Sequence, residues 1–243
     1  MTEAAGPVLI TGASRGLGKA LAMEFARLGH PVALCARGRD ELERVASEVR
    51  GLGVGCVSET VDVADAGEVD RWVAAAAREL GAPAVLVNNA SVLGPRVDLS
   101  DYPTDEWTRA VAVNLNGTFF ASRAVVPLMS RAGGGAIINV SSGAAIPPRT
   151  GWGAYAVSKA AVEALTLNMA RELADARIRV NAVDPGAMRT GMRAEAYPKE
   201  DPGRLKPPEE TTGVFVWLAG PGATGVTGER ISADEWIAEH GQR

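Results

Sequence analysis

The amino-acid sequence predicts an α/β fold: a single doubly wound domain with a central parallel sheet of six or seven strands and helices on both faces. Short apolar runs of four to eight residues alternate along the chain with longer, Ala-rich amphipathic stretches. Near-continuous apolar strands separated by helices are typical of parallel sheets that are covered on both faces. No Ser- or Pro-rich linker divides the 243 residues before Pro198. We therefore expect one domain that spans residues 1–243.

Each element follows from this alternation. The expected strands, in chain order, are Pro7–Thr11, Val32–Arg37, Val54–Val61, Ala84–Asn88, Ala136–Ser141 and Ile178–Val183. The expected helices are Leu17–Leu28, Asp40–Leu52, Ala66–Leu80, Asp105–Arg131 and Tyr155–Ala174. Strand–helix–strand crossovers are right-handed, which leaves a doubly wound open sheet as the simplest topology. The Pro-rich segment from Tyr197 to Pro208 is expected to be a surface loop.

Composition excludes several classes of protein. Apolar residues make up 47% of the chain and charged residues 22%, which excludes a disordered chain and a disulfide-stapled miniprotein. The 25 basic and 29 acidic side chains give a net charge of −4, which argues against nucleic acid as a partner. The start of the chain lacks the basic and apolar regions of a secretory signal, and the uncharged run from Thr211 to Gly228 contains too many Gly and Thr residues to span a membrane. We expect a cytoplasmic protein with no membrane partner.

The sequence predicts no metal site. A zinc site would need four ligands from Cys, His or carboxylate side chains at characteristic spacings. The two cysteines and two histidines are scattered and form no such pattern: Cys35, Cys56, His30 and His240. Both thiols are expected to be reduced and to lie on strands.

Glycines follow the first expected strand, at the point where a doubly wound sheet binds its ligand. The residues of interest in this turn are Gly12, Ser14, Arg15, Gly16, Leu17 and Gly18. Glycines there let the backbone approach a pyrophosphate, which then binds free N–H groups of the helix. A tight turn between a strand and a helix needs glycine in any case, so this motif alone leaves a structural role open. A nucleoside-triphosphatase loop is excluded, because Lys19 is followed by Ala20 rather than by Ser or Thr.

The end of the second strand indicates which dinucleotide would bind. An acidic residue about 20 positions after the glycine turn would bond the ribose 2′-hydroxyl of NAD. Here the strand runs into Arg37 without a carboxylate. A guanidinium group binds phosphate with two parallel charge-assisted hydrogen bonds, and Arg15 in the turn provides a second cation. The pattern favours NADP(H); an NAD-linked enzyme would require both arginines to be idle.

Several motifs occur in a fixed order along most of the chain. They are Thr11–Gly18, Asp62-Val63, Asn88-Asn89-Ala90, Asn114, the set Ser142, Tyr155 and Lys159, and Pro185-Gly186 with Thr190. In this order they resemble the classical short-chain dehydrogenases/reductases, whose fold is the Rossmann domain. The resemblance implies that Asp62 and Val63 contact the adenine ring, that Asn89 and Ala90 belong to the cofactor site, and that Pro185, Gly186 and Thr190 hold the nicotinamide carboxamide. It also implies four catalytic residues: Asn114, Ser142, Tyr155 and Lys159. Of these, Tyr155 and Lys159 are expected to contact the cofactor as well.

Two positions depart from the family pattern. Ser91 stands where the family usually has Gly, beside the expected nicotinamide site. The segment from Thr227 to Trp236 keeps a Thr-Gly pair but lacks the common Asp-Gly-Gly ending, which often supports tetramer contacts in the family.

The chemistry of the catalytic set can be argued from the residues themselves. Tyr155 and Lys159 are four positions apart in a helical stretch and share one face. An unperturbed phenol has a pKa near 10, and a nearby ammonium group is expected to lower it. Tyr155 would then exchange a proton with the substrate oxygen, while Ser142 hydrogen-bonds the same oxygen. The resemblance implies that Asn114 supports Lys159 through water.

These observations predict an NADP(H)-dependent oxidoreductase that acts on a ketone, an aldehyde or a secondary alcohol. The alternative is a non-catalytic NADP(H)-binding redox sensor or assembly partner on the same fold. Trp152 is expected to wall the substrate pocket or simply to pack in its loop, and residues 188–206 are expected to form a mobile lid. Within that lid, Arg189 and Arg193 are expected to be solvated rather than to bind an anion. The Ala-rich surfaces of the two longest helices predict a homodimer or homotetramer.

Overall fold

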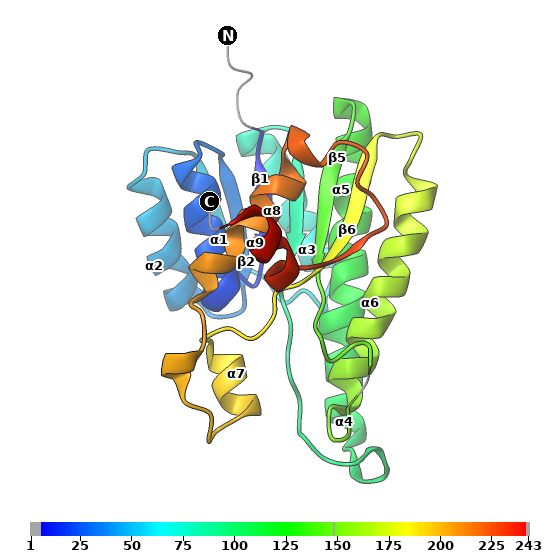
Figure 1. Cartoon of the computed structure of the whole chain (residues 1–243). Helices are drawn as coiled ribbons and strands as arrows, with labels where there is room; N and C mark the ends of the chain where they lie inside the picture. Colours follow the sequence, from blue (N-terminus) through cyan, green and yellow to red (C-terminus); the bar gives the residue numbers. More distant parts are fainter. Residues whose placement is uncertain (1–5, 148, 242–243) are drawn as a thin grey trace.

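The computed structural model describes residues 6–147 and 149–241 of the chain. Its centre is a sheet of seven parallel strands in the order β3-β2-β1-β4-β5-β6-β7 (Figure 1). The strands are β1 (Val8–Thr11), β2 (Val32–Ala36), β3 (Cys56–Thr60), β4 (Val85–Asn88), β5 (Gly135–Val140), β6 (Ile178–Asp184) and β7 (Arg230–Ser232). The prediction of a doubly wound parallel sheet with six or seven strands is confirmed.

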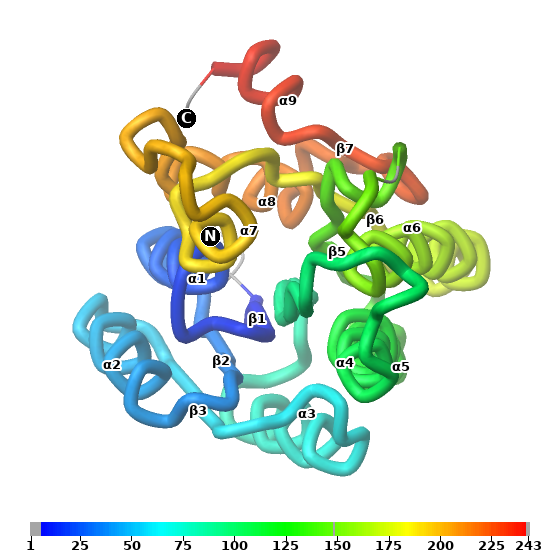
Figure 2. Tube along the Cα trace, turned by 90° about the horizontal axis from the view of Figure 1, so that it is seen from below, coloured from blue at the N-terminus to red at the C-terminus, as the bar shows by residue number. Residues whose placement is uncertain are grey.

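Helices cover both faces of the sheet (Figures 1 and 2). One face packs against α1 (Gly16–Arg27), α2 (Arg39–Arg50), α8 (Thr212–Ala219) and α9 (Ala233–His240). The other face packs against α3 (Ala66–Leu80), α5 (Gly117–Ala132) and α6 (Gly153–Glu172). Two further helices, α4 (Thr104–Val111) and α7 (Gly191–Ala196), lie toward the carboxyl ends of the strands.

Burial on both faces explains why β1 and β2, in the middle of the sheet, are almost entirely apolar. Along β1, Val8 and Ile10 belong to one hydrophobic cluster, whereas Leu9 between them belongs to the cluster on the opposite face. In β2 the same alternation separates Leu34 from Cys35. Successive strand residues point to opposite faces, so a sheet covered twice needs apolar side chains throughout.

The order of the strands fixes the place of the site. The sheet grows outward from β1 in one direction through β2 and in the other through β4, so the loops that follow β1 and β4 meet at the same edge. In a doubly wound sheet, ligands bind at this switch point, beyond the carboxyl ends of the strands. The glycine turn and Asn89 are therefore neighbours although 77 positions separate Gly12 from Asn89.

The helix expected from Asp105 to Arg131 is interrupted, which corrects the prediction. It consists of α4, a π turn η2 (Ala112–Asn116) and α5. The side chain of Asn114 bonds the backbone of Val92 twice, donating from Nδ2 to the carbonyl oxygen at 3.0 Å and accepting the N–H at Oδ1 at 2.8 Å. These two bonds hold the π turn against the loop after β4. Apolar periodicity continues through the turn, so the sequence does not reveal it.

The C-terminal third contains elements that the sequence did not predict. The short strand β7 pairs with the edge of β6, matching Arg230 to Ala182 and Ser232 to Asp184. Helix α8 lies in the uncharged run after Thr211. In the described part of the chain, no helix has the length and apolar character needed to cross a lipid bilayer.

Candidate active site

The glycine turn forms a cradle with no room for side chains. Gly12 has a φ of +67°, and a Cβ there would lie 2.8 Å from Cα of Ala90. A Cβ on Gly18 would lie 2.3 Å from the carbonyl oxygen of Gly12, so glycine is what allows α1 to pack this closely on the turn. The first turn of α1 has neither a side-chain cap nor an acidic residue. Its N–H groups therefore remain available to an anion.

Hydrogen bonds lock the loop after β4 onto this cradle. Thr11 Oγ1 accepts the N–H groups of Asn89 and Ala90, both at 3.0 Å. The amide Nδ2 of Asn89 donates to the carbonyl oxygens of Thr11 and Gly12, both at 3.0 Å. Next to them, the buried hydroxyl of Ser91 has no hydrogen-bond partner in the described part of the chain. Asn89 and Ala90 thus shape the cradle, whereas Ser91 leaves a buried polar atom beside it.

Basic side chains lie at the carboxyl ends of β1 and β2. Arg15 and Arg37 are exposed, and neither forms an ion pair with any residue that the structure describes. Arg39 begins helix α2, whose cap residue Gly38 offers no side-chain bond. A hollow of about 310 Å³ opens there, lined by Arg39, Leu42, Glu43, Ser58, Glu59 and Thr60. Sequence reasoning missed Arg39, although its position two residues after Arg37 could have indicated it.

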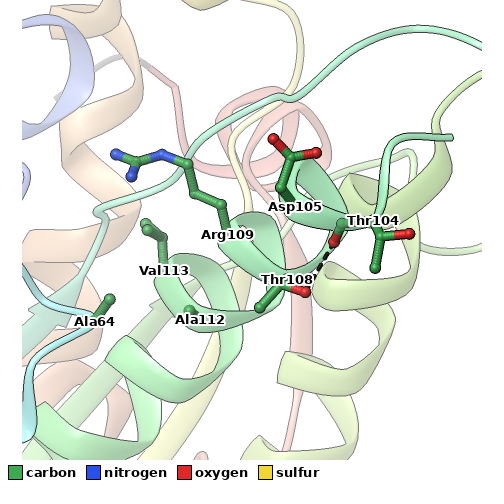
Figure 3. Close-up of a pocket in the computed structure, with 7 residues that line it drawn as sticks. All are labelled: Ala64, Thr104, Asp105, Thr108, Arg109, Ala112 and Val113. Atoms are coloured by element: carbon green, nitrogen blue, oxygen red, sulfur yellow. Dashed lines mark hydrogen bonds between the residues drawn. The ribbon is translucent and has the colours of Figure 1, made fainter.

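The turn after β3 holds Asp62 and Val63. Asp62 Oδ1 accepts the N–H of Ala64 at 3.1 Å, and the N–H of Asp62 donates to Glu68 at 2.7 Å. Val63 is buried against α5, where a Cβ on Gly117 would lie 2.8 Å from it. This turn borders a hollow of about 570 Å³ (Figure 3), lined by Ala64, Thr104, Asp105, Thr108, Arg109, Ala112 and Val113. The hollow contains none of the four predicted catalytic residues.

Tyr155 and Lys159 lie one turn apart on α6, and both are buried. Lys159 Nζ lies 5.8 Å from the centre of the Tyr155 ring and donates to the carbonyl oxygen of Val140 at 2.7 Å. Ser142 follows β5, and its Oγ accepts the N–H of Ala144 at 3.1 Å. The structure thus brings three of the predicted catalytic residues together.

Burial shifts the pKa values of both titratable groups toward their neutral forms. Burial raises the pKa of Tyr155; hydrogen bonding with Ser142 opposes this, and the negative charge of Asp184 adds to it. Burial lowers the pKa of Lys159 from 10.5 to about 8. The sequence argument expected the neighbouring ammonium group to lower the pKa of the phenol; burial instead raises it, because it disfavours the charged phenolate.

Asn114 contacts α6 directly through a serine, Ser158. Its Nδ2 donates to Ser158 Oγ at 3.0 Å, and Ser158 Oγ donates to the carbonyl oxygen of Tyr155 at 2.8 Å. Asn114 and Ser158 are both buried. This chain of bonds ties the π turn to the first turn of α6, where the phenol is carried. The sequence did not single out Ser158, which stands next to Lys159.

The segment that follows β6, from Pro185 to Thr190, lies against the glycine cradle. The N–H of Gly186 donates to Asp184 Oδ1 at 3.1 Å. Thr190 Oγ1 accepts the N–H of Arg193 at 3.2 Å and so caps α7. A Cβ on Gly16 would lie 3.5 Å from Thr190 Cγ2, so the segment touches the glycine cradle.

An aromatic cluster extends from Tyr155 toward α7. Trp152 is buried, with its ring centre 5.6 Å from that of Tyr155 and 6.0 Å from that of Tyr197. The guanidinium group of Arg96 lies over both Trp152 and Tyr197, at 4.7 and 5.0 Å from the ring centres. It also donates to the carbonyl oxygen of Ala196 at 2.6 Å. These contacts fasten the segment around α7 to the loop after β4.

Arg193 is not a solvated charge, contrary to the expectation from the sequence. Its Nε and Nη2 donate to the two carboxylate oxygens of Glu200, both at 2.6 Å. The guanidinium also lies 4.0 Å from the ring centre of Tyr197. Arg189 is exposed. Within residues 6–147 and 149–241, no group of three or more His, Cys, Asp or Glu side chains could hold a metal ion.

Comparison with known proteins agrees with this geometry. A family model described as short chain dehydrogenase matches residues 7–201. The uncharacterized oxidoreductase YciK of Escherichia coli (strain K12) is 33% identical over 237 residues, which cover 93% of this chain and 90% of YciK. A short chain dehydrogenase of Shigella flexneri 2a str. 301, solved in complex with NADP, has a TM-score of 0.91 and 31% identity over 96% of this chain and 100% of that one. Another from Escherichia coli CFT073, in complex with NADPH, has a TM-score of 0.89 and 33% identity over 94% of this chain and 96% of that one.

The family model covers most of the chain and spans the glycine cradle, the π turn and the buried Tyr155 and Lys159. The sheet order and the ordered motifs agree with it. The resemblance inferred from the sequence is therefore confirmed: this chain belongs to the short-chain dehydrogenase family of oxidoreductases.

Proposed function

We propose that the protein is an NADP(H)-dependent oxidoreductase that transfers a hydride between the nicotinamide and a ketone or aldehyde, or the corresponding alcohol. One observation carries the proposal: the phenol of Tyr155 is buried beside Ser142 and lies one helical turn from a buried lysine. A structural tyrosine needs no such surroundings, whereas a proton-transferring phenol needs a positioned partner and a nearby charge.

The residues present fit a phosphorylated dinucleotide. The cradle of Gly12, Gly16 and Gly18 leaves the N–H groups of α1 free for a pyrophosphate. Arg15 and Arg37 offer two cations for a 2′-phosphate, with Arg39 nearby as a third. NADP and NADPH in the related structures support this choice. Leu17, Ser14, Asp62, Val63, Asn89, Ala90, Pro185, Gly186 and Thr190 complete the proposed cofactor site.

When bound in this site, NADP(H) would supply or accept the hydride at its nicotinamide ring. Tyr155 donates its proton to the carbonyl oxygen in reduction and takes one from the alcohol in oxidation. Its raised pKa keeps the phenol protonated at neutral pH, as reduction requires. The hydroxyl of Ser142 donates to the same oxygen as charge develops on it. Lys159 binds the cofactor and returns protons to Tyr155, with Asn114 supporting that path through water.

We assign residues 188–206 as the lid over the substrate. Loops that follow a cofactor contact commonly close over the reaction site. Arg96 fastens this segment to the loop after β4 through Ala196 and Tyr197, and Trp152 lies between the fastening and Tyr155. The substrate pocket would therefore have an apolar, aromatic wall.

We also propose a homodimer or homotetramer. Three large apolar side chains are exposed on α5 and α6: Phe119 at 43%, Val157 at 47% and Leu167 at 45%. These helices lie side by side on one face of the sheet in both views (Figures 1 and 2). Apolar area of this kind is characteristic of a contact with a second copy.

A panel of ketones, aldehydes and secondary alcohols, followed by NADPH absorbance, tests the proposed activity. We expect turnover of at least one compound, and its loss in the Tyr155→Phe variant. Tight NADPH binding without turnover of any compound would instead favour the non-catalytic sensor. Equal affinity for NADPH and NADH would contradict the assigned roles of Arg15 and Arg37.

A further inference from the structure

Three charged side chains, those of Arg230, Glu163 and Asp184, form a connected cluster next to the proposed active site. Arg230 on β7 donates from Nε to Glu163 at 2.7 Å and from Nη2 to Asp184 at 3.0 Å. Ser141 Oγ donates to the same Glu163 oxygen at 2.5 Å. The carboxylate side chains of Glu163 and Asp184 are only 11% and 16% exposed, and that of Arg230 is 35% exposed.

This arrangement joins the three segments that surround Tyr155. Glu163 lies on α6, one turn beyond Lys159. Ser141 immediately precedes Ser142. Asp184 ends β6 and accepts the N–H of Gly186, in the segment assigned to the nicotinamide. A Cβ on Gly143 would lie 3.1 Å from Asp184 Oδ2, so the loop that carries Ser142 rests against this carboxylate.

Charge balance makes Arg230 indispensable to the arrangement. Two carboxylates and one guanidinium leave a net charge of −1 in a largely buried place. Without Arg230 the two carboxylates would be uncompensated there, and desolvated charges without a partner are strongly unfavourable. Ser141 and the N–H of Gly186 would remain as donors, but neither carries charge.

We infer that Arg230 is a positioning residue of the active site: by pairing with Glu163 and Asp184 it fixes the Ser142 loop and the Asp184–Gly186 turn around Tyr155. This inference rests on the proposed function. The C-terminal strand, which departs from the family pattern, would then contribute to catalysis without touching the substrate.

The electrostatic consequence has a definite sign. Tyr155 is faced by Lys159 from its own helix, by Ser142 from the loop after β5 and by Asp184 from the end of β6. The negative charge of Asp184 raises the pKa of Tyr155, and Arg230 partly offsets that charge. Loss of Arg230 should therefore raise the pKa of the phenol further.

The test compares Arg230→Met with two double variants that have the same net charge as the wild type in this cluster. Arg230→Met/Asp184→Asn removes the carboxylate that faces Tyr155 but keeps an oxygen for the N–H of Gly186. Arg230→Met/Glu163→Gln removes the other carboxylate and leaves Asp184 charged. For each, the alcohol oxidation rate is measured against pH with a substrate from the panel, together with Tm. Arg123→Met, which removes an exposed partner of Asp70, is the control for loss of a surface ion pair.

We expect Arg230→Met to lower kcat by about twofold to a hundredfold, the range that corresponds to coupling between residues in contact. It should also move the ascending limb of the oxidation profile, where Tyr155 loses its proton, to higher pH. Arg230→Met/Asp184→Asn should move the limb back, and Arg230→Met/Glu163→Gln should not. A folded Arg230→Met with an unchanged profile and unchanged kcat would overturn the inference, as would two double variants with the same profile. Should Arg230→Met fail to fold, the two double variants decide the question. Activity retained in Tyr155→Phe would instead contradict the proposed function itself.

Discussion

The ammonium group of Lys159 donates a 2.7 Å hydrogen bond to the carbonyl oxygen of Val140, the last residue of β5. This bond anchors α6 to the carboxyl end of the strand that leads into Ser142. The phenol one turn earlier on α6 is thereby placed beside the serine hydroxyl. Lys159, which we assign to proton transfer, is thus also a structural contact, and its ammonium group is buried.

The buried lysine should make stability depend on pH in a defined window. Burial lowers the pKa of Lys159 from 10.5 to about 8, so between these pH values the unfolded chain binds more protons than the folded protein. The free energy of unfolding contributed by this group should therefore rise from pH 8 to pH 10.5, by about 3 kcal/mol in total. Urea unfolding of the wild type and of Lys159→Met at several pH values isolates the contribution as the difference between the two curves. A difference that is constant with pH would contradict the prediction.

Tyr155→Phe should reduce turnover while cofactor binding and fold survive. The substitution removes only the hydroxyl, and loss of a general acid/base lowers rates by about 10² to 10⁴. Ser142→Ala should slow turnover with NADPH affinity nearly unchanged, whereas Lys159→Met should impair both. Steady-state rates and NADPH fluorescence titration separate these effects. More than about a tenth of wild-type activity in Tyr155→Phe would mean that the proton travels by another route.

Arg37→Asp should shift cofactor preference toward NAD(H). It removes a cation and sets a carboxylate against the 2′-phosphate, and a charge-assisted hydrogen bond is worth about 1.5–3 kcal/mol. We expect NADPH affinity to fall at least about tenfold while NADH affinity stays the same or improves. Arg27→Asp is the control for a general effect of reversed surface charge, because Arg27 lies at the end of α1 that is away from the glycine cradle. A parallel fall in both affinities would rule out phosphate recognition.

Arg96→Gln should loosen the proposed lid. The change removes two cation–π contacts, each worth about 0.5–1 kcal/mol at an exposed site. The shorter glutamine side chain also moves the donor away from the carbonyl oxygen of Ala196. We expect KM for the carbonyl substrate to rise several-fold while NADPH affinity is unchanged. Arg149→Gln, an exposed arginine in the loop before α6, is the matched control. Unchanged KM in Arg96→Gln would leave the segment without a role in substrate binding.

Glutamate on the outer face of α6 should dissociate the proposed oligomer. Val157→Glu and Leu167→Glu place a charge in an apolar contact, whereas Leu52→Glu changes a side chain of similar exposure, 42%, after α2. Sedimentation at micromolar concentration should show a smaller species for the first two variants only. A wild-type protein that sediments as a monomer would contradict the proposal directly.

The interior strands were predictable because burial on both faces leaves a strong local signal. Strand β7 was not, because its three residues, Arg230 to Ser232, contain a single apolar side chain and are held at the edge by pairing with β6. Spacing alone correctly placed Tyr155 and Lys159 on one helical face, because four positions are one turn.

Contacts between distant segments had no such signal. The bidentate pair of Arg193 and Glu200 depends on the chain doubling back after α7. The influence of burial on the phenol depends on the packing of Trp152 and of residues around α7, which no local pattern specifies. Sequence reasoning named Tyr155 and Lys159 as candidate catalytic residues but underestimated how strongly burial favours their neutral forms.

The π turn from Ala112 to Asn116 rotates α5 about the helix axis relative to α4. Without it, α4 and α5 would form one continuous helix. One extra residue in a ladder of 3.6 residues per turn rotates everything beyond it by about 100°. Helix α4 can therefore direct Arg109 toward the hollow beside Ala64, while α5 turns its own face to α3 and the sheet. Removing a single residue from this turn would restore a regular helix and at the same time put Asn114 out of phase with Val92 and Ser158. The π turn thus sets the rotation of α5 relative to α4. A regular helix in its place would point Asn114 away from its hydrogen-bond partners in the candidate site.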